Sequence, residues 1–485
     1  MKSVLEKTRD PLWQRTMAVR IDFNNMLSPV IGREEGLDPD ALFGMQKRID
    51  EVDAMIRNRS GKGSEFLGFM DLPYKGEEEL DRIQKTADHL AAMSDIHVIL
   101  GIGGSYLGSR AVIEALLPTY RNETDRTKRH ERPRIYFEGN NMDPDAFSAL
   151  MDLLPKKKPA NLAETFSLNV VSKSGGTVET AVAFRFFHKL AKEVYGNDYA
   201  KYVVATTDAS KGKLRAIADV EGFETYVIPD DVGGRYSVLT PVGLLPSAVA
   251  GVNIYGLIAG ARYMAERCKD TDLKKNPAYM LAALNHLSYT KGKNVSIMAS
   301  WCKALEFFGF WHDQLCAESL GKDEMGRVPL TSVNTRDLHA RGQEIQDGPR
   351  NTVVTNLVVE NFNHEVVVPR VDTDLDGLNY LAGKTLGEMQ IKAMAGTCYA
   401  YARDGRPSMN VLIPELNAFT LGQLFYLFEL SIVAEGYLMG INPLDQPGVE
   451  AYKKFMFGNL GRADMNKYKE EFDARPKGSS DYLVG

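Results

Sequence analysis

Hydroxyl and cationic side chains gather where an apolar run ends, in the segment VVSKSGGTVET at 170–180. Ser172, Ser174 and Thr177 offer hydroxyl donors, Lys173 offers a positive charge, and the two glycines let the backbone curl around a ligand. Hydroxyls and backbone amides suit an anion with several oxygens, such as a phosphate monoester. The pattern therefore indicates a phosphate-binding loop, and a plain loop without a ligand is the alternative.

A second glycine-rich turn, GIGGSYLGS, occupies 101–109. A dinucleotide-binding fingerprint would need glycine where Tyr106 stands, a P-loop would need lysine where Ser109 stands, and a nucleophile elbow would need glycine where Leu107 stands. Backbone amides at a helix N-terminus and the Ser105 hydroxyl remain, and both could face an anion. A tight strand-to-helix turn with no ligand is the alternative.

The other chemically capable side chains stand in four separate stretches. Arg235 follows a glycine pair in DDVGGRYSVLTPVG, and Glu318 ends an apolar helical stretch before a glycine. His339 lies in DLHARGQEIQDG, and Lys453 or Lys454 lies in DQPGVEAYKK. Taken one at a time, Arg235 is as typical of a surface arginine as of a functional one, whereas the other three are more typical of a helix-end carboxylate, a structural histidine and a solvated lysine.

The elements that must position these residues alternate between apolar strands and amphipathic helices. We expect strands at 97–104, 134–139, 168–174, 201–208 and 225–231, with helices at 109–117 and 179–195. A second run has strands at 294–300, 355–361 and 409–415, with helices at 303–319 and 421–440. This alternation predicts an α/β fold of two doubly wound parallel sheets with helices on both faces. Ligands of such sheets bind at the carboxyl ends of the strands, where both glycine turns lie.

The chain is too long for one compact core, and we divide it into four parts. These are a helical N-terminal arm at 1–60, a first domain at 61–250, a second domain at 251–440, and a helical tail at 441–485 that carries Lys453. The segment 236–261 has no charged residue and is long enough to span a bilayer, but prolines and glycines interrupt it. We expect two buried helices there, with Gly251 as the stop between them.

Charge and cysteine usage limit the function classes. The chain of 485 residues has 58 Lys and Arg against 64 Asp and Glu, a net charge of −6, which disfavours nucleic acid and anionic membranes as partners. The four cysteines form no CxxC pair, and the N-terminus has no apolar signal region. We therefore expect a cytoplasmic protein with reduced thiols.

One candidate metal pair needs an explanation. His312 and Cys316 are four residues apart and share a face if the segment is helical. Two ligands do not make a metal site, and the surrounding sequence is apolar, so we expect both side chains to pack in the core and expect no structural metal.

In this order, the six stretches resemble the phosphoglucose isomerase family of the sugar-isomerase-domain superfamily. The resemblance spans 101–453; GGRYS and DQPGVExxK are its most specific parts, whereas SKSGGT and GIGGS recur across the superfamily. It implies two sugar-isomerase domains and reversible aldose–ketose isomerisation of glucose 6-phosphate and fructose 6-phosphate through an enediolate, in glycolysis and gluconeogenesis. It also implies a cytoplasmic homodimer that uses neither metal nor cofactor.

The resemblance assigns roles to particular residues. Glu318 resembles the base, Arg235 the cation beside the intermediate, and His339 and Lys453 the residues that open the sugar ring, with His339 contributed across the dimer interface. The residues that resemble substrate contacts are Gly104, Ser105, Ser172, Lys173, Ser174, Thr177 and Gln446.

Two positions depart from the family pattern, and rival functions remain. Gly176 stands where many relatives have threonine, and Leu444 stands where many have an aromatic residue. A phosphosugar isomerase that also accepts mannose 6-phosphate is the nearest rival, and a phosphosugar-sensing module without catalysis is a rival of another class. Glu318, His339 and Lys453 together argue against a sensor, which needs no such set.

Overall fold

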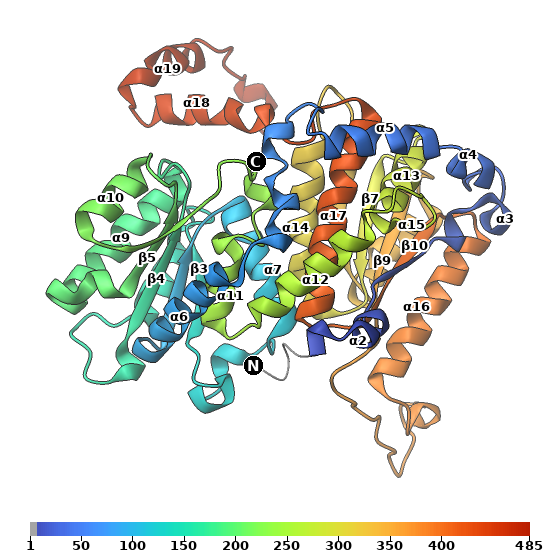
Figure 1. The fold of residues 1–485 in the computed structure, drawn as a ribbon, viewed down its shortest axis with the longest axis horizontal. Helices are drawn as coiled ribbons and strands as arrows, with labels where there is room; N and C mark the ends of the chain where they lie inside the picture. The colour runs from blue at the N-terminus through green and yellow to red at the C-terminus, as the bar shows by residue number, and fades with distance from the viewer. Residues whose placement is uncertain (1–6) are drawn as a thin grey trace.

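The computed structural model describes residues 7–485 and contains two five-stranded sheets that lie beside each other (Figure 1). The first sheet has the order β3-β2-β4-β5-β6, and all its neighbours are parallel. Its strands are β2 (Ile96–Leu100), β3 (Arg134–Glu138), β4 (Phe166–Val171), β5 (Val203–Thr207) and β6 (Glu224–Val227). All five are confirmed predictions from the sequence.

Both faces of the first sheet are covered, because successive side chains of a strand point to opposite faces. In β2, Ile96, Val98 and Leu100 pack into a core with α8 (Pro144–Leu153), α9 (Val178–Tyr195) and α10 (Lys213–Glu221). Ile99 points the other way, into a larger core that contains α6 (Glu77–Met93), α7 (Leu107–Leu116) and α11 (Pro241–Ala250).

The second sheet has the order β1-β10-β9-β7-β8. Strands β7 (Val295–Ser300), β8 (Val328–Val333), β9 (Thr352–Asn361) and β10 (Ser408–Glu415) are parallel. On the side of the larger core lie α12 (Ile254–Arg267), α13 (Pro277–Thr290), α14 (Glu306–Leu320) and α17 (Ala418–Met439). On the other face lie α15 (Arg341–Asp347) and α16 (Leu386–Arg403). The two halves meet where α7 packs against α14.

The N-terminal arm is not purely helical, which corrects our expectation. It contains α2 (Pro11–Thr16), α3 (Ser28–Ile31), α4 (Pro39–Phe43) and α5 (Gln46–Arg57). Between them, β1 (Arg20–Asp22) pairs antiparallel with β10, and α5 packs on α17. Three residues carry too little periodicity to predict a strand, and β1 exists only because β10 offers it an edge.

The uncharged segment around Gly251 forms two buried helices, as predicted. Helix α11 ends at Ala250, and Gly251 adopts a left-handed conformation with φ +99° that stops it. The Asn253 side chain then accepts a hydrogen bond from the Gly256 amide and begins α12. Helix α17 is also long and apolar enough to cross a membrane, but nearly all of it is buried inside this fold, which accounts for its composition.

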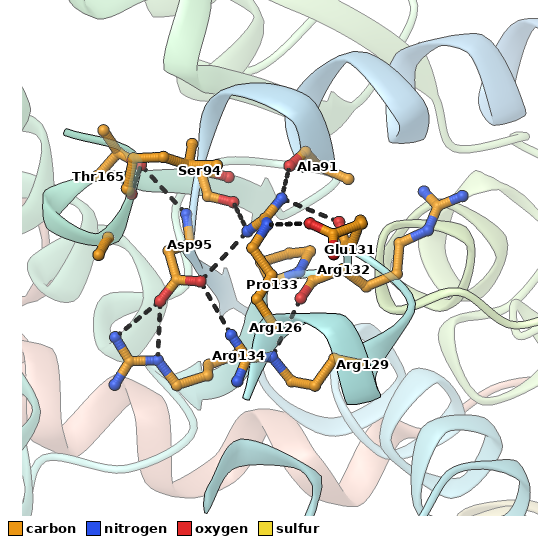
Figure 2. A network of polar contacts seen from close by, with 12 residues as sticks. Ala91, Ser94, Asp95, Arg126, Arg129, Glu131, Arg132, Pro133, Arg134 and Thr165 are labelled. Atoms are coloured by element: carbon orange, nitrogen blue, oxygen red, sulfur yellow. Dashed lines mark hydrogen bonds and ion pairs between the residues drawn. The ribbon is translucent and has the colours of Figure 1, made fainter. Parts of the chain in front are cut away.

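The edge of the first sheet opposite the glycine turns is held by an ionic network (Figure 2). Asp95, directly before β2, is buried and forms ion pairs with Arg126 at 3.2 Å, Arg129 at 2.9 Å and Arg134 at 3.0 Å. Without the negative charge of Asp95, these three closely spaced guanidinium groups would repel one another. The network therefore fixes the start of β2 and of β3, far from the carboxyl ends of the strands.

The tail contains α18 (Glu450–Asn459) and α19 (Asn466–Asp473), which pack mainly on each other. In Figure 1 the pair forms a separate layer above α9 and α10. Phe457 of α18 and Arg462 line a cavity of about 390 Å³ that α9 and α10 also line. Helices α18 and α19 are therefore attached to the first domain by a small contact surface.

Candidate active site

The two glycine turns meet at the carboxyl end of the first sheet. Strands β2 and β4 are parallel neighbours, so the loops that follow them leave the sheet side by side. They line one cavity of about 610 Å³. The predicted substrate contacts that line it are Gly104, Ser105, Ser172, Lys173, Ser174, Thr177 and Gln446. The structure therefore brings together the whole set that the sequence predicted.

The loop 172–177, the phosphate loop, is shaped by its own hydrogen bonds. The Gly175 amide donates to Ser172 Oγ at 3.1 Å, and the Gly176 amide donates to Ser174 Oγ at 3.1 Å. Each hydroxyl oxygen accepts from the loop, which leaves its hydrogen to donate to a ligand. The loop can thus present several donors to an anion while its fold is retained.

Two glycines are required by close backbone approaches. A Cβ on Gly104 would lie 2.0 Å from the carbonyl oxygen of Gly234. Gly175 has φ +64°, and a Cβ there would lie 2.2 Å from the Leu214 amide. These contacts press the first glycine turn against the GGR segment and the phosphate loop against the start of α10. Side chains at either position would push the cavity walls apart.

Lys173 lines the cavity, but its ammonium group is engaged elsewhere. It forms an ion pair with Asp230 at 2.9 Å and lies 3.4 Å from the carbonyl oxygens of Pro229 and Asp230. Asp230 belongs to the loop that follows β6, so this pair joins the loop ends of two strands of the sheet. The positive charge of Lys173 is therefore partly neutralised before any ligand arrives.

Arg235 is fixed by protein acceptors on every side. Its side chain is only 1% exposed. Nε donates to Ser319 Oγ at 2.7 Å, and one terminal nitrogen donates to the carbonyls of Pro443 and Asp445 at 2.7 and 3.1 Å. The other terminal nitrogen, Nη1, lies 2.9 Å from Gln446 Oε1 and 3.4 Å from Glu318 Oε2. A guanidinium has five N–H donors, and the acceptors named here are enough for all of them. The position and orientation of the positive charge are therefore fixed.

Glu318 lies in the last turn of α14, as its position before a glycine predicted. Its Oε1 accepts from Gln314 Nε2 at 2.9 Å, and its Oε2 faces Arg235. The side chain is 26% exposed, so it is sheltered but reachable. Sequence reasoning missed Gln314, although it stands four residues before Glu318 on a helix and so had to share its face.

Glu318 and Arg235 lie at the edge of the cavity rather than along its wall. Gly234, next to Arg235, lines the cavity, and so does Gln446, which Arg235 holds. A Cβ on Gly103, in the first glycine turn, would lie 3.0 Å from Gln314 Nε2. Gln314, which donates to the Glu318 carboxylate, therefore lies next to the glycine turn that lines the cavity.

His339 and Lys453 do not reach this cavity within the chain. His339 ends the short helix Arg336–His339 and is exposed, and its side chain makes no hydrogen bond or ion pair to the described residues 7–485. Lys453 lies on α18, where its ammonium pairs with Glu450 at 2.6 Å. Of the residues predicted to act on the sugar, the structure places only Glu318 and Arg235 together.

His312 and Cys316 are both buried in the core, as predicted. The His312 ring packs edge-on against Phe428, and burial lowers the pKa of His312 to about 3, so the ring is neutral. Within residues 7–485, no three His, Cys, Asp or Glu side chains are arranged to hold a metal ion.

Comparisons with known proteins place the chain in one family. The sequence pattern of the family described as phosphoglucose isomerase matches residues 83–339 and 382–478. A glucose-6-phosphate isomerase of Bacillus cereus (strain AH187) is 46% identical over 461 residues, which cover 95% of this chain and 99% of that protein. A protein of Bacillus thuringiensis (strain Al Hakam) with the same description matches equally well.

Two crystal structures share the fold over nearly the whole chain. A hypothetical protein from Thermus thermophilus has a TM-score of 0.80 and 29% identity, and the match covers 92% of this chain and all of that one. A glucose-6-phosphate isomerase from Chlamydia trachomatis has a TM-score of 0.74 and 18% identity over 98% of both chains.

Proposed function

The chain belongs to the phosphoglucose isomerase family and interconverts glucose 6-phosphate and fructose 6-phosphate, and we propose here how its residues do so. The observation that carries the proposal is the contact between Glu318 and Arg235 at the edge of a cavity walled by the phosphate loop. One side of the site grips an anion, and the other side offers a carboxylate beside a fixed cation.

The phosphate loop holds a handle that is remote from the reacting carbons. The hydroxyls of Ser172, Ser174 and Thr177 and the amides of the loop bind the phosphoryl group. Binding energy gained there orients C1 and C2 of the open-chain sugar toward Glu318. Orientation of this kind is worth about 7 to 11 kcal/mol in favourable cases.

Glu318 moves the proton. An aldose–ketose isomerisation removes a proton from one carbon and returns a proton to its neighbour, and the C–H acid is weak. The carboxylate takes the C2 proton of glucose 6-phosphate, and the electrons form an enediolate. Arg235 Nη1, held toward Glu318 and Gln446, stabilises the negative charge that develops on the oxygens. Return of the proton to C1, together with passage of the hydroxyl proton from O2 to O1, gives fructose 6-phosphate.

We propose that the active unit is a homodimer in which His339 acts in the partner's site. In Figure 1, α16 and the segment 362–385 stand away from the body of the chain. That segment exposes apolar side chains: Val366, Val367, Val371, Leu375 and Tyr380. At its base, Gln390 of α16 donates to the carbonyl of Asn334, just before the helix that ends at His339. An unburied apolar arm beside an exposed histidine favours a second copy as its partner.

We propose that the Lys453 ammonium contacts the sugar when α18 approaches the cavity. The segment before α18 is fixed, because Arg235 holds the carbonyls of Pro443 and Asp445. Helix α18 itself begins only at Glu450, and it packs mainly on α19. Lys453 and His339 would then exchange protons with the ring oxygen and its hydroxyl and open the ring.

We propose that the enzyme works in the cytoplasm and without a metal or cofactor. All four cysteines are free, and three of them are buried, as in proteins of a reducing compartment. Acid–base transfer between a carboxylate and adjacent carbons needs no redox partner. Fractionation of cells that make the protein tests the location.

A coupled assay of fructose 6-phosphate turnover, with and without a chelator, tests the proposed function. We expect turnover that is unchanged by the chelator, and loss of activity with it would indicate a metal-assisted isomerase instead. The same assay with mannose 6-phosphate separates this function from a broader phosphosugar isomerase. Binding of fructose 6-phosphate without any turnover would favour the sensing module.

A further inference from the structure

The turn 208–213, which follows β5, packs directly against the phosphate loop. Thr207, the last residue of β5, donates its hydroxyl to the carbonyl of Ser172 at 2.8 Å. The Lys213 amide donates to the carbonyl of Ser174 at 2.9 Å. The turn is thereby fastened to the first and third residues of the phosphate loop.

The turn has a fixed shape because of two residues. Asp208 Oδ1 accepts from the amides of Ser210 at 2.9 Å and Lys211 at 2.8 Å. Gly212 has φ +92°, and a Cβ there would lie 2.8 Å from the carbonyl oxygen of Ser174. Only glycine allows this approach. The Asp208 side chain on one side and the contact of Gly212 with Ser174 on the other therefore fix the backbone of Lys211.

Lys211 lines the same cavity as Ser172, Ser174 and Thr177. Its side chain is exposed and makes no hydrogen bond or ion pair to the part of the chain from residue 7 onward. The pKa of Asp208 is lowered mainly by the amides of Ser210 and Lys211 and, more weakly, by the charge of the nearby lysines. Asp208 is therefore already satisfied by the backbone.

The other cations around the cavity already contact protein oxygens. The ammonium of Lys173 is paired with Asp230, and the donors of Arg235 are used by protein oxygens. A phosphate monoester carries up to two negative charges, which hydroxyls and amides solvate but do not neutralise. Among the described residues that line the cavity, Lys211 is the one lysine whose ammonium has no hydrogen bond or ion pair.

We propose that Lys211 is a phosphate-binding residue, whose ammonium pairs with the phosphoryl group seated in the phosphate loop. The inference rests on the isomerase function proposed above and adds a residue to its substrate grip. It assigns the neutralising charge to the turn after β5, whereas the sequence pattern of the phosphate loop points to Lys173.

Three variants test the assignment by steady-state kinetics with fructose 6-phosphate. Lys211→Met should raise KM about tenfold, because a charged hydrogen bond is lost, and leave kcat nearly unchanged, because the phosphate is remote from the chemistry. Lys211→Arg keeps the charge and should stay near wild type. Lys213→Met is the matched control, since Lys213 is on the same turn but lines the cavity under α18 instead.

Two further readouts separate charge pairing from a structural effect. Inorganic phosphate should inhibit the wild type competitively, and Lys211→Met should weaken that inhibition about tenfold as well. Added potassium chloride should raise the KM of the wild type more steeply than that of Lys211→Met, since only the wild type has the pair to screen.

An unchanged KM in Lys211→Met, or an equal rise in Lys213→Met, overturns the assignment. Circular dichroism tests whether the variants are folded. If Lys211→Met is not folded, the salt dependence of KM in the wild type and in Lys211→Arg tests the assignment. A wild type that binds phosphate but does not turn over the sugar would refute the isomerase function and not this inference.

Discussion

Glu318 Oε2 lies 3.4 Å from Nη1 of Arg235, and the same nitrogen donates to Gln446 Oε1 at 2.9 Å. The three residues come from α14, from the segment after the first sheet, and from the segment before α18. One guanidinium therefore joins the carboxylate, the edge of the cavity and both halves of the chain. That geometry suits the stabilisation of an enediolate, because the charge is in place before the substrate reacts.

Replacement of Arg235 by lysine tests this role. Lysine keeps the charge but has no planar fork, so it cannot satisfy Ser319, Gln446 and two carbonyls at once. We expect kcat to fall about 10²-fold or more, with a smaller change in KM. Arg215→Lys on α10 is the control, since within residues 7–485 Arg215 forms an ion pair only with Asp219 of the same helix and does not line the cavity, so neither constant should change. Wild-type kcat in Arg235→Lys would contradict the role.

A mixed dimer tests the contribution of His339 across the interface. Glu318→Gln and His339→Gln should each be inactive as pure proteins. In a heterodimer purified through two different tags, one site keeps Glu318 from one chain and His339 from the other, so about half the wild-type activity should return. An inactive heterodimer, or a monomeric wild type in analytical ultracentrifugation, would disprove the shared site.

Asp95 should be important for stability and not for catalysis. Asp95→Ala leaves Arg126, Arg129 and Arg134 without their shared carboxylate, and we expect it to lower the free energy of unfolding by about 3 kcal/mol. Asp88→Ala is the control: Asp88 also pairs with an arginine, at 2.7 Å, but its side chain is 51% exposed, so about 0.5 kcal/mol or less is expected. Urea titrations measure both, and equal losses would contradict the account.

Acid should destabilise the protein partly through His97. Burial lowers the pKa of His97 to about 3, from 6.5 in the unfolded chain, and its Nδ1 bonds to Ser167 Oγ at 2.8 Å. The folded state therefore binds fewer protons than the unfolded state between pH 6.5 and about 3, and stability falls as the pH falls through this window. The slope from one such group is about 1.4 kcal/mol per pH unit.

His97→Gln removes that group and keeps a polar side chain of similar length. The difference in unfolding free energy between the variant and the wild type should therefore shrink as the pH is lowered from about 7 to about 4. Taking the difference cancels the contributions of other titrating groups. One of these is the buried carboxyl of Glu429, whose pKa is raised by burial, so that it stabilises the fold as the pH falls. A difference that is independent of pH would show that the fold does not lower the pKa of His97.

The sequence was sufficient to predict most strands and the place of the cavity. Apolar runs of five or six residues specify buried parallel strands, and the polar loops that follow two neighbouring strands must meet at one edge. Thus Ser105 and Ser172 could be brought together without coordinates. The strand β8, Val328–Val333, was missed because its run of six includes a proline and few strongly apolar residues.

Features that depend on tertiary packing could not be predicted in the same way. The pairing of Lys173 with Asp230 joins loops 57 residues apart, and no local pattern indicates it. The contribution of Lys211 follows only from the hydrogen bonds that attach its turn to the phosphate loop. Gln314, by contrast, was predictable from its helical spacing to Glu318 and was overlooked.

The positions of His339 and Lys453 also lie beyond local sequence reasoning. Their motifs imply a role at the sugar, but neither lines the cavity within one chain. The role of His339 depends on a second copy, and that of Lys453 depends on the placement of α18 and α19, which pack mainly on each other. These two roles stay predictions that the mixed dimer and the corresponding single variants address.

The most direct test of the central claim follows the proton at carbon in heavy water. Nuclear magnetic resonance should detect deuterium at C2 of glucose 6-phosphate and C1 of fructose 6-phosphate during turnover by the wild type. Glu318→Gln should bind inorganic phosphate with an affinity within about tenfold of the wild type, yet show no turnover and no deuterium at either carbon. Full turnover or exchange in Glu318→Gln, or wild-type turnover with no deuterium incorporated, would contradict the account.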